Sequence, residues 1–385
     1  MTYAAGRRIH DADSHVMERA DWLASYADAR TRPLLATYLA EGEPGLAVLA
    51  QAERAFEARQ SDPAAVGEAE RNLMGLKGWL GLGAFDPAER ARALDLLGFE
   101  SQLLFPSLAF DQAVATDDPE VLEGGVRALN RGLGEFGQSD ARLRPVGFVP
   151  QRLGPEKAID MLEEAFALGC HTVNVEMVAP AGARSFSHRD YDPFWERFAE
   201  RDVPLVIHVG TEGAWRKPVP SSFGNNGHAS PTHQSDAPRD AHSFLGIGFA
   251  PGLFLGALVL DGVFQRIPGL RVCVAELGAV WVPSWLRQLD HAARAFRRAQ
   301  PEVAALPDPP SHTIRERCKF TPFAGEDVGW LMAQNGPELW MFSSDYPHHE
   351  GTDDPIRRFE KTMSGLDRAA RDAFYFRNFE ALFGA

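Results

Sequence analysis

The chain has 385 residues, of which 45% are hydrophobic and 24% are charged, an ordinary composition for a globular enzyme. Lysine and arginine number 39 against 53 aspartates and glutamates, so the net charge is −14 at pH 7. No cluster of basic residues offsets this excess of acid. The balance therefore argues against nucleic acid or an anionic membrane as a partner.

Three features of the sequence bear on where the protein works. Cys170, Cys273 and Cys318 lie far apart without a CxxC pair, so we expect buried free thiols in a reducing compartment. The N-terminal stretch MTYAAGRRIHDADSH lacks the apolar core of a signal peptide. No uncharged apolar run approaches the ~20 residues of a membrane span. We therefore expect a cytoplasmic protein.

Short apolar runs recur along the whole chain, and they are continuous rather than alternating in polarity. Continuous apolar runs are typical of parallel strands that are covered on both faces. The runs predict eight strands, which end at His15 and span 101–107, 144–150, 171–177, 204–210, 271–277, 318–323 and 338–345.

Amphipathic segments between these runs have the period of helices. PEKAIDMLEEAFALGC places apolar residues on one face and ends at Gly169, and DPFWERFAERDV begins with Asp192 as a cap before Pro193. Eight strand–helix units predict a (β/α)₈ barrel. An open doubly wound sheet is the alternative, but DADSHVME after the first strand lacks its glycine-rich turn.

Two segments depart from this repeat within what we expect to be a single barrel domain over 1–385. Residues 16–86 are rich in Ala, Glu and Arg, and they predict a helical insertion that covers the barrel mouth as a lid. Residues 211–248 form a long segment rich in Gly, Ser, Pro, His and Asn. Because loops of this length are often functional and this one follows the fifth strand, we expect an active-site loop.

Acidic and imidazole side chains gather where barrel active sites lie, at the carboxyl ends of the strands. Positions i and i+2 of a strand face the same way, so Asp13 and His15 can bind one ion together. Several carboxylates at one buried mouth would repel one another without a cation. We therefore predict a divalent metal site with the candidate ligands Asp13, His15, Glu176, His208, Glu276 and Asp345.

Four of these candidates also have a purely structural interpretation. His208 could be a core histidine, and Asp345 could cap the following helix. Glu276 could pair with Arg271 or Arg287. Glu176 could be an exposed residue at the start of a loop.

Four motifs in this order, DADSH, PLVIHVG, RVCVAELGAVWVPSWLRQLD and MFSSDYPH, resemble the amidohydrolase-related family that includes aminocarboxymuconate-semialdehyde decarboxylase and γ-resorcylate decarboxylase. The resemblance implies a metal-dependent barrel whose ligands correspond to Asp13, His15, His208 and Asp345. A histidine that takes part in the chemistry is often found where this chain has Glu276. The site is therefore rich in carboxylates, which suits manganese, iron or zinc. We expect one ion, and the additional carboxylates leave room for a second.

The favoured function is hydrolysis of a small organic acid or amide by metal-activated water, with Asp345 as general base and His348 as general acid. Glu276 is a further catalytic candidate, and His242 and Trp281 are candidate substrate contacts. Trp281 could instead simply pack against the barrel. The alternatives are decarboxylation of an aromatic or enoic acid, a dinuclear iron/manganese oxygenase, and a catalytically silent barrel. We expect a homo-oligomer or pairing with a related subunit.

Overall fold

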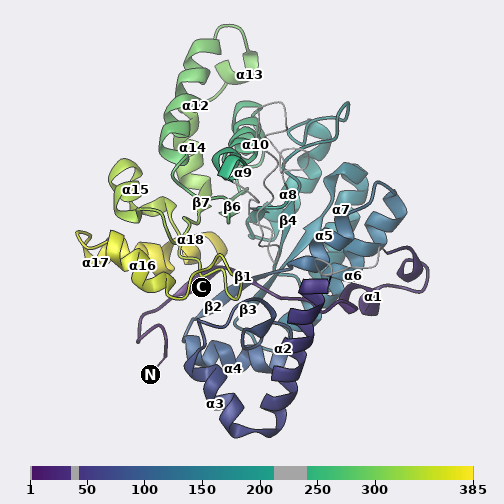
Figure 1. The fold of residues 1–385 in the computed structure, drawn as a ribbon. Coiled ribbons are helices and arrows are strands. Elements are labelled where there is room, and N and C mark those ends of the chain that lie inside the picture. The colour runs from purple at the N-terminus through teal and green to yellow at the C-terminus, as the bar shows by residue number, and fades with distance from the viewer. Residues whose placement is uncertain (1, 36–42, 212–240, 385) are drawn as a thin grey trace.

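Seven parallel strands form one curled sheet in the computed structural model, which describes residues 2–35, 43–211 and 241–384 (Figure 1). The strands pair in chain order, each with the next. They are β1 (His10–His15), β2 (Ser101–Phe105), β3 (Leu143–Val149), β4 (Thr172–Val175), β5 (Leu205–His208), β6 (Val272–Ala275) and β7 (Cys318–Phe320).

Helices connect the strands and cover the outside of the sheet (Figure 1). Those that precede β5 are α1 (Trp22–Tyr26), α2 (Glu43–Ser61), α3 (Pro63–Arg71), α4 (Pro87–Leu97), α5 (Leu108–Val114), α6 (Pro119–Gly137), α7 (Pro155–Ala167) and α8 (Asp192–Glu200). Those that follow it are α9 (Ala241–Gly246), α10 (Phe249–Leu260), α11 (Val263–Arg266), α12 (Val282–Phe296), α13 (Pro301–Ala304), α14 (Pro310–Arg317), α15 (Val328–Asn335), α16 (Pro355–Thr362), α17 (Arg368–Asp372) and α18 (Asn378–Phe383). Short 3-10 turns are η1 (Arg32–Leu34), η2 (Gly78–Leu80), η3 (Gln151–Leu153), η4 (Arg189–Tyr191) and η7 (Pro337–Leu339), and η8 (Ala373–Arg377) is a π-helical turn.

The eighth predicted strand joins the two edges of the sheet without forming a regular strand. Trp340 bridges to Phe320 of β7, and Tyr346 bridges to Ser14 of β1. The amide of Asp345 donates to the carbonyl of Asp13 over 2.9 Å. The backbone of Asp345 has a φ of 53°, outside the extended region, which interrupts regular pairing. The predicted (β/α)₈ barrel is therefore confirmed, with residues 340–346 as its eighth, irregular stave.

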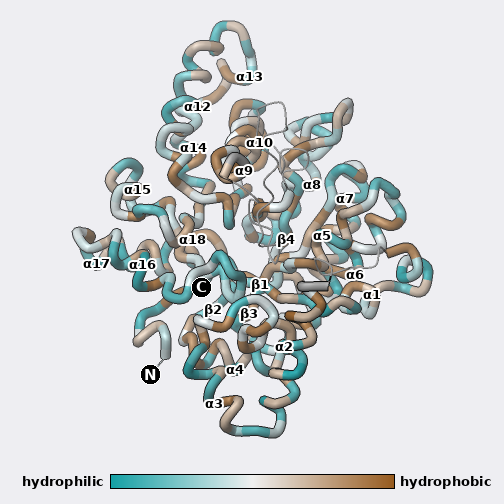
Figure 2. Tube along the Cα trace, viewed as in Figure 1, coloured by the Kyte–Doolittle hydropathy of each residue, from teal (hydrophilic) through white to brown (hydrophobic). Residues whose placement is uncertain are grey.

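The strands are apolar throughout because both of their faces are buried. On β5, Leu205 and Ile207 belong to the large outer core that packs under the helices, whereas Val206 belongs to a small inner core. At the opposite end from the strands' carboxyl termini, Phe379 of α18 joins this inner core and stacks on His10 at the start of β1, with ring centroids 4.7 Å apart. Figure 2 shows the peripheral helices α16 and α17 as largely hydrophilic. Because successive side chains of β5 point to opposite faces of the sheet, the side chain of His208 points to the inner side, like that of Val206.

The insertion predicted at 16–86 is helical, with α1, α2 and α3 in its described part. Its small apolar cluster includes Trp79 and Leu49, and it also includes Met17 after β1 and Leu108 after β2. Arg59 of α2 donates to both carboxylate oxygens of Glu89 on α4, over 2.7 and 2.8 Å. The insertion thus packs on the segments that follow the first two strands, and its function as a lid stays a prediction.

The thiols, the segment 211–248 and the possibility of a membrane span are three further subjects of the sequence predictions. The cysteines are all buried and free. Of the segment 211–248, residues 212–240 lie outside the described residues, so its function as an active-site loop stays a prediction. No helix in the described ranges combines the length and the apolar character that crossing a membrane requires.

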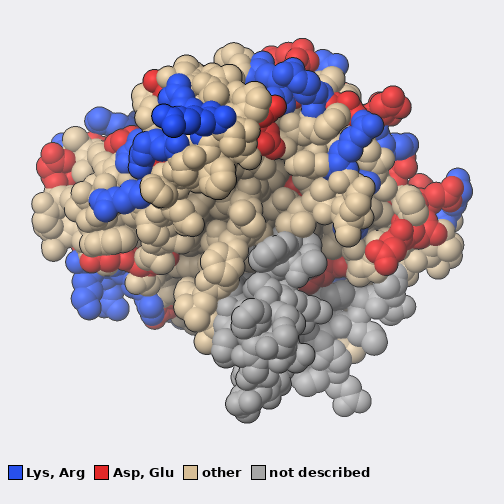
Figure 3. Space-filling view, turned by 90° about the horizontal axis from the view of Figure 1, so that it is seen from above, with Lys and Arg blue, Asp and Glu red and all other residues tan. Residues whose placement is uncertain are grey.

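On the face shown in Figure 3, basic and acidic side chains are interspersed around uncharged surface.

Asp11 links the first stave of the barrel to the last. Its carboxylate accepts from the amide of Ser344 over 2.8 Å, from the Ser344 hydroxyl over 2.6 Å and from the side-chain amide of Gln102 over 2.8 Å. Burial raises the pKa of Asp11 to about 7, against the opposing effect of these hydrogen bonds. Asp11 therefore fixes the segment that carries Asp345.

We expect Asp11→Ala to lower the free energy of unfolding by about 3 kcal/mol, because it leaves buried donors on Ser344 and Gln102 without an acceptor. Urea denaturation measures this change. Asp21→Ala is the matched control, since the exposed Asp21 makes no side-chain cap hydrogen bond at α1. Equal stability of the two variants would contradict a closing function for Asp11.

Candidate metal centre

Six side chains from β1, β5, β6 and the irregular eighth stave converge at the carboxyl ends of the strands. They form two overlapping groups of four, and the ligand atoms within each group lie within 4.8 Å of one another. Both groups contain His15 and Glu276. The first group adds Asp13 and His208, and the second adds Asp345 and His348.

In the first group, two imidazoles face two carboxylates. The Nε2 atom of His208 lies 3.4 Å from Oδ1 of Asp13 and 3.2 Å from Oε2 of Glu276. The Nε2 atom of His15 lies 3.2 Å from the same Asp13 oxygen. Nitrogen and oxygen donors of this kind suit manganese, iron and zinc.

The second group extends the same centre toward the eighth stave. Oδ1 of Asp345 lies 3.6 Å from Nε2 of His15 and 3.2 Å from Nδ1 of His348. The rings of His15 and His348 stack with centroids 3.7 Å apart. The Nε2 atom of His348 lies 2.7 Å from the hydroxyl of Ser107, which fixes the other side of the ring.

Backbone carbonyls orient both inner histidines. Nδ1 of His15 lies 3.2 Å from the carbonyl oxygen of Pro106, and Nδ1 of His208 lies 2.9 Å from that of Val209. Donation from Nδ1 to a carbonyl leaves Nε2 as the ligating atom, which is the usual arrangement for a metal-binding histidine. The Nε2 atoms of both rings therefore face the carboxylates.

Two members of the centre lie on left-handed backbone. Glu276 has a φ of 50° and Asp345 has a φ of 53°. A residue with a Cβ at such an angle costs about 1 kcal/mol or more, and such strain concentrates at functional sites. The amide of Glu276 donates to the hydroxyl of Thr321 over 3.0 Å, which supports the turn after β6. Both carboxylates are thus held where an extended strand would not put them.

The electrostatics of the centre fit a bound cation. Burial acts to raise the pKa of Asp13, but the charge of His208 and hydrogen bonds from His15 and His208 hold it well below its usual range. Glu276 is buried, and neither of its carboxylate oxygens accepts a hydrogen bond within the described chain. A buried carboxylate in this state is costly unless a cation compensates it. The donor set therefore fits a divalent metal ion.

Glu176 lies apart from both groups. Its Oε2 atom accepts from the amide of Arg152 over 2.9 Å, and its Oε1 atom lies 2.9 Å from the Arg152 guanidinium. This ion pair already compensates the buried carboxylate. We therefore leave Glu176 out of the proposed ligand set, although the sequence predicts it there.

Of the two predicted substrate contacts, the structure describes the side chain of one, Trp281. The indole of Trp281 donates to the carbonyls of Leu277 and Gly278 over 3.0 and 3.1 Å, and its ring packs edge-on against Phe320. This is the packing interpretation of Trp281. The side chain of His242 lies outside the described residues.

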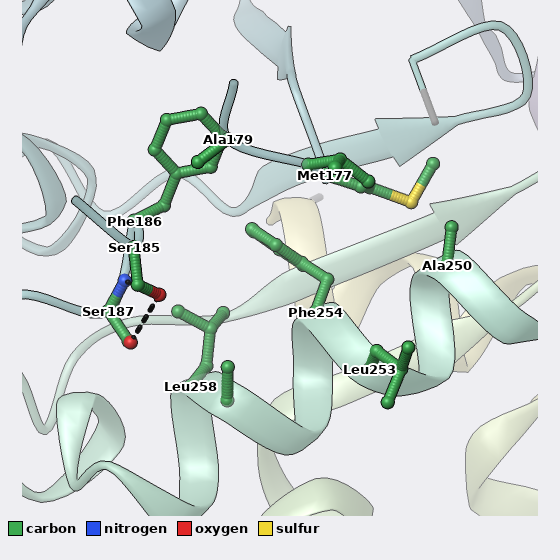
Figure 4. Close-up of a pocket in the computed structure, with 11 residues that line it drawn as sticks. Met177, Ala179, Ser185, Phe186, Ser187, Ala250, Leu253, Phe254 and Leu258 are labelled. Carbon is green, nitrogen blue, oxygen red and sulfur yellow. Dashed lines mark hydrogen bonds between the residues drawn. The ribbon is translucent and has the colours of Figure 1, made fainter. Parts of the chain in front are cut away.

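An apolar groove lies beside the end of β4, against α10 (Figure 4). Its volume is about 180 Å³, and Met177, Phe186, Leu253, Phe254 and Leu258 are among its lining residues. None of the six side chains of the centre lines it.

Two residues near the centre escape sequence reasoning. Ser107 follows β2 and holds His348, but a serine after a strand has no distinctive pattern. Lys77 lies in the insertion, where neither period nor motif marks it. Its place beside the eighth stave depends on the fold of the insertion, in which the amide of the next residue, Gly78, donates to the carbonyl of Pro347.

The fold and the centre define a metal-dependent α/β-barrel enzyme. The chain belongs to the amidohydrolase family, whose model matches residues 10–385. It is thus an enzyme of this family, with a buried cluster able to hold a divalent metal.

Solved structures share the fold over nearly the whole chain. An amidohydrolase from Mycobacterium avium subsp. paratuberculosis K-10 is 20% identical with a TM-score of 0.73, covering 98% of this chain and 100% of that one. The 5-carboxyvanillate decarboxylase of Sphingomonas paucimobilis is 16% identical with a TM-score of 0.61, covering 98% of each chain. A dihydroxybenzoic acid decarboxylase from Polaromonas sp. JS666, with bound manganese and 2-nitroresorcinol, is 19% identical with a TM-score of 0.60, covering 98% and 97%.

Proposed function

We propose that the protein is a metal-dependent, non-oxidative decarboxylase of a small aromatic or enoic acid. The observation that carries the proposal is the mixed donor set, in which two carboxylates and two imidazoles in each group, without thiolate, suit manganese. The likeness to decarboxylases, one of them with bound manganese, supports it. This choice replaces hydrolysis, the function favoured by the sequence, with its first alternative.

Asp13, His15, His208 and Glu276 would hold the ion, with Asp345 beside it. A divalent ion there supplies positive charge for the substrate carboxylate and a neighbouring oxygen. The buried walls of the centre exclude water, which strengthens these electrostatic interactions.

Asp345 is the proton donor in this proposal. Its side chain is 13% exposed, whereas those of Asp13, His15, His208 and Glu276 are at most 3% exposed, so it is the carboxyl group most open to a substrate. Its proton passes to the carbon that bears the substrate carboxylate and forms a C–H bond. The C–C bond then breaks, its electron pair restores the π system, and carbon dioxide leaves. Asp345, which is 13% exposed, regains its proton from solvent, and the buried His348, 3.2 Å away, orients its carboxyl group.

A second candidate is a centre with two ions and oxygen-activating chemistry. The observation that favours it is the overlap of the two ligand groups through His15 and Glu276. Glu276, on its positive-φ backbone, is the carboxylate that both groups share. Glu176, tied to Arg152, is not needed for this version.

A panel assay separates these functions. The manganese-loaded protein is given hydroxybenzoic acids with a carboxylate beside a hydroxyl, and carbon dioxide release is measured alongside oxygen consumption. The corresponding benzamides and aryl esters test hydrolysis. We expect carbon dioxide release without oxygen uptake. Cleavage of amides or esters with no carbon dioxide from any acid would favour hydrolysis as the function. Oxygen-dependent turnover would favour the two-ion centre.

A further inference from the structure

Lys77 carries a buried ammonium group in the insertion, just before η2. Its Nζ atom is shielded from solvent and has no hydrogen-bond partner in the described part of the chain. Arg59 of the same insertion is also buried, but it is paired through two hydrogen bonds with Glu89. A buried cation without such a partner is expensive, which makes Lys77 exceptional in this segment.

The backbone around Lys77 is fixed against the eighth stave. The amide of Gly78 donates to the carbonyl of Pro347 over 2.7 Å, two residues beyond Asp345. The indole of Trp79 donates to the carbonyl of Glu18 over 3.0 Å. A Cβ atom added at Gly81 would lie 2.7 Å from Cβ of Pro347, so the two segments are in close contact. Lys77 is therefore held in place beside the metal centre.

The charges that act on Lys77 come mainly from this stave and the loop after it. Burial lowers the pKa of Lys77 below its usual value, and Asp345 is the strongest of the carboxylates that oppose this shift, followed by Asp353 and Glu350. Burial lowers the pKa of His349, and the positive charges of His348 and Lys77 lower it further. The ammonium thus lies near Asp345 without a hydrogen bond to it, and an anionic ligand would complete its contacts.

We propose that Lys77 binds a second anionic oxygen of the substrate, one that stays charged throughout the reaction, such as a second carboxylate or a phenolate. This inference rests on the proposed decarboxylase function. The metal ion would already supply positive charge for the departing carboxylate, and a second cation there would only add stabilisation to a charge that is lost when neutral carbon dioxide forms. An anion that persists carries no such penalty. Lys77 would then select diacids or ionised hydroxy acids over simple monoacids.

Calorimetric binding to the manganese-loaded protein tests this without turnover. The probes are two pairs that differ by one charge: isophthalate with its monomethyl ester, and 4-hydroxy-3-nitrobenzoate, ionised at pH 8, with its methyl ether. We expect the unmethylated member of at least one pair, which carries the additional negative charge, to bind about 10- to 100-fold more tightly than its methylated partner. Preference within the first pair identifies a carboxylate, and preference within the second identifies a phenolate.

Lys77→Met should abolish this preference, and Lys77→Arg should keep part of it. The melting temperature and manganese content of Lys77→Met should not fall, since methionine has a shape similar to that of lysine and the substitution removes a desolvated charge. Lys319→Met is the matched control, because Lys319 is a buried lysine of β7 whose Nζ donates to the carbonyl of Arg315 on α14. Its charge preference should equal that of the natural protein.

Two results would overturn the inference: no preference for the unmethylated probes in the natural protein, or the same preference in Lys77→Met. Failure of the decarboxylase proposal is seen separately. If the dianions bind through Lys77 but no acid in the panel releases carbon dioxide, the anion site stands and the reaction is a different one.

Discussion

Asp345→Asn is expected to lower kcat by about 10²- to 10⁴-fold while the protein stays folded and keeps its metal. The amide has no acidic proton to deliver to the substrate carbon. Asparagine is among the residues with a Cβ atom that best tolerate the left-handed backbone at this position, where φ is 53°, so the variant should not add strain. Steady-state carbon dioxide release and manganese content per chain measure the two parts of this prediction.

Asp353→Asn is the control for Asp345→Asn. Asp353 is an exposed carboxylate in the loop after the eighth stave and belongs to neither ligand group. It should keep nearly the full rate. If Asp345→Asn turned over within tenfold of the natural protein at equal metal content, Asp345 would not be the proton donor. A loss of metal in that variant would instead make Asp345 chiefly a ligand.

His208→Ala should have the largest effect on the metal itself, with manganese affinity reduced at least about 100-fold and activity lost with it. The imidazole faces both Asp13 and Glu276, and its removal leaves these buried carboxylates without their shared nitrogen neighbour. Titration of the metal-free protein with manganese, followed by the rise in melting temperature, measures the affinity.

The matched substitution for His208→Ala is His312→Ala. His312 is an exposed histidine on α14, paired with Glu316. It should bind manganese as the natural protein does. An unchanged affinity in His208→Ala would remove β5 from the metal centre and leave a site built from β1 and the eighth stave.

The barrel and most of the centre could be predicted because they depend on local pattern. Strands covered on both faces must be apolar throughout, so β5 and β6 stand out in the sequence, and a polar residue at their carboxyl ends is conspicuous. The fixed period of a strand places His208 inside the barrel. The eighth strand was predicted as regular, but the left-handed backbone at Asp345 does not follow from residue type.

What the sequence could not predict depends on contacts between distant segments. Glu176 looked like the other carboxylates at strand ends, and only the folded chain shows that Arg152 compensates it. Trp281 has its indole turned to the backbone of its own loop. Lys77 is brought beside Asp345 by hydrogen bonds of its neighbours to Pro347 and Glu18, which no periodicity encodes.

Several expectations stay predictions. They are the homo-oligomer or related partner subunit, the cytoplasmic location, and the contribution of the segment 211–248 to the active site. A small-molecule substrate is part of the proposed function, because the donor set and the buried ammonium suit a compact anion.

The most direct measurement is the divalent metal content per chain of protein purified without chelators, for the natural sequence and for the Asp13→Ala/His208→Ala double variant. We predict about one manganese, iron or zinc ion per natural chain, and close to none in the folded double variant. About two ions per chain would favour the overlapping-group centre. A folded natural protein that holds no metal, and that takes up none when manganese, iron and zinc are supplied, would contradict the account.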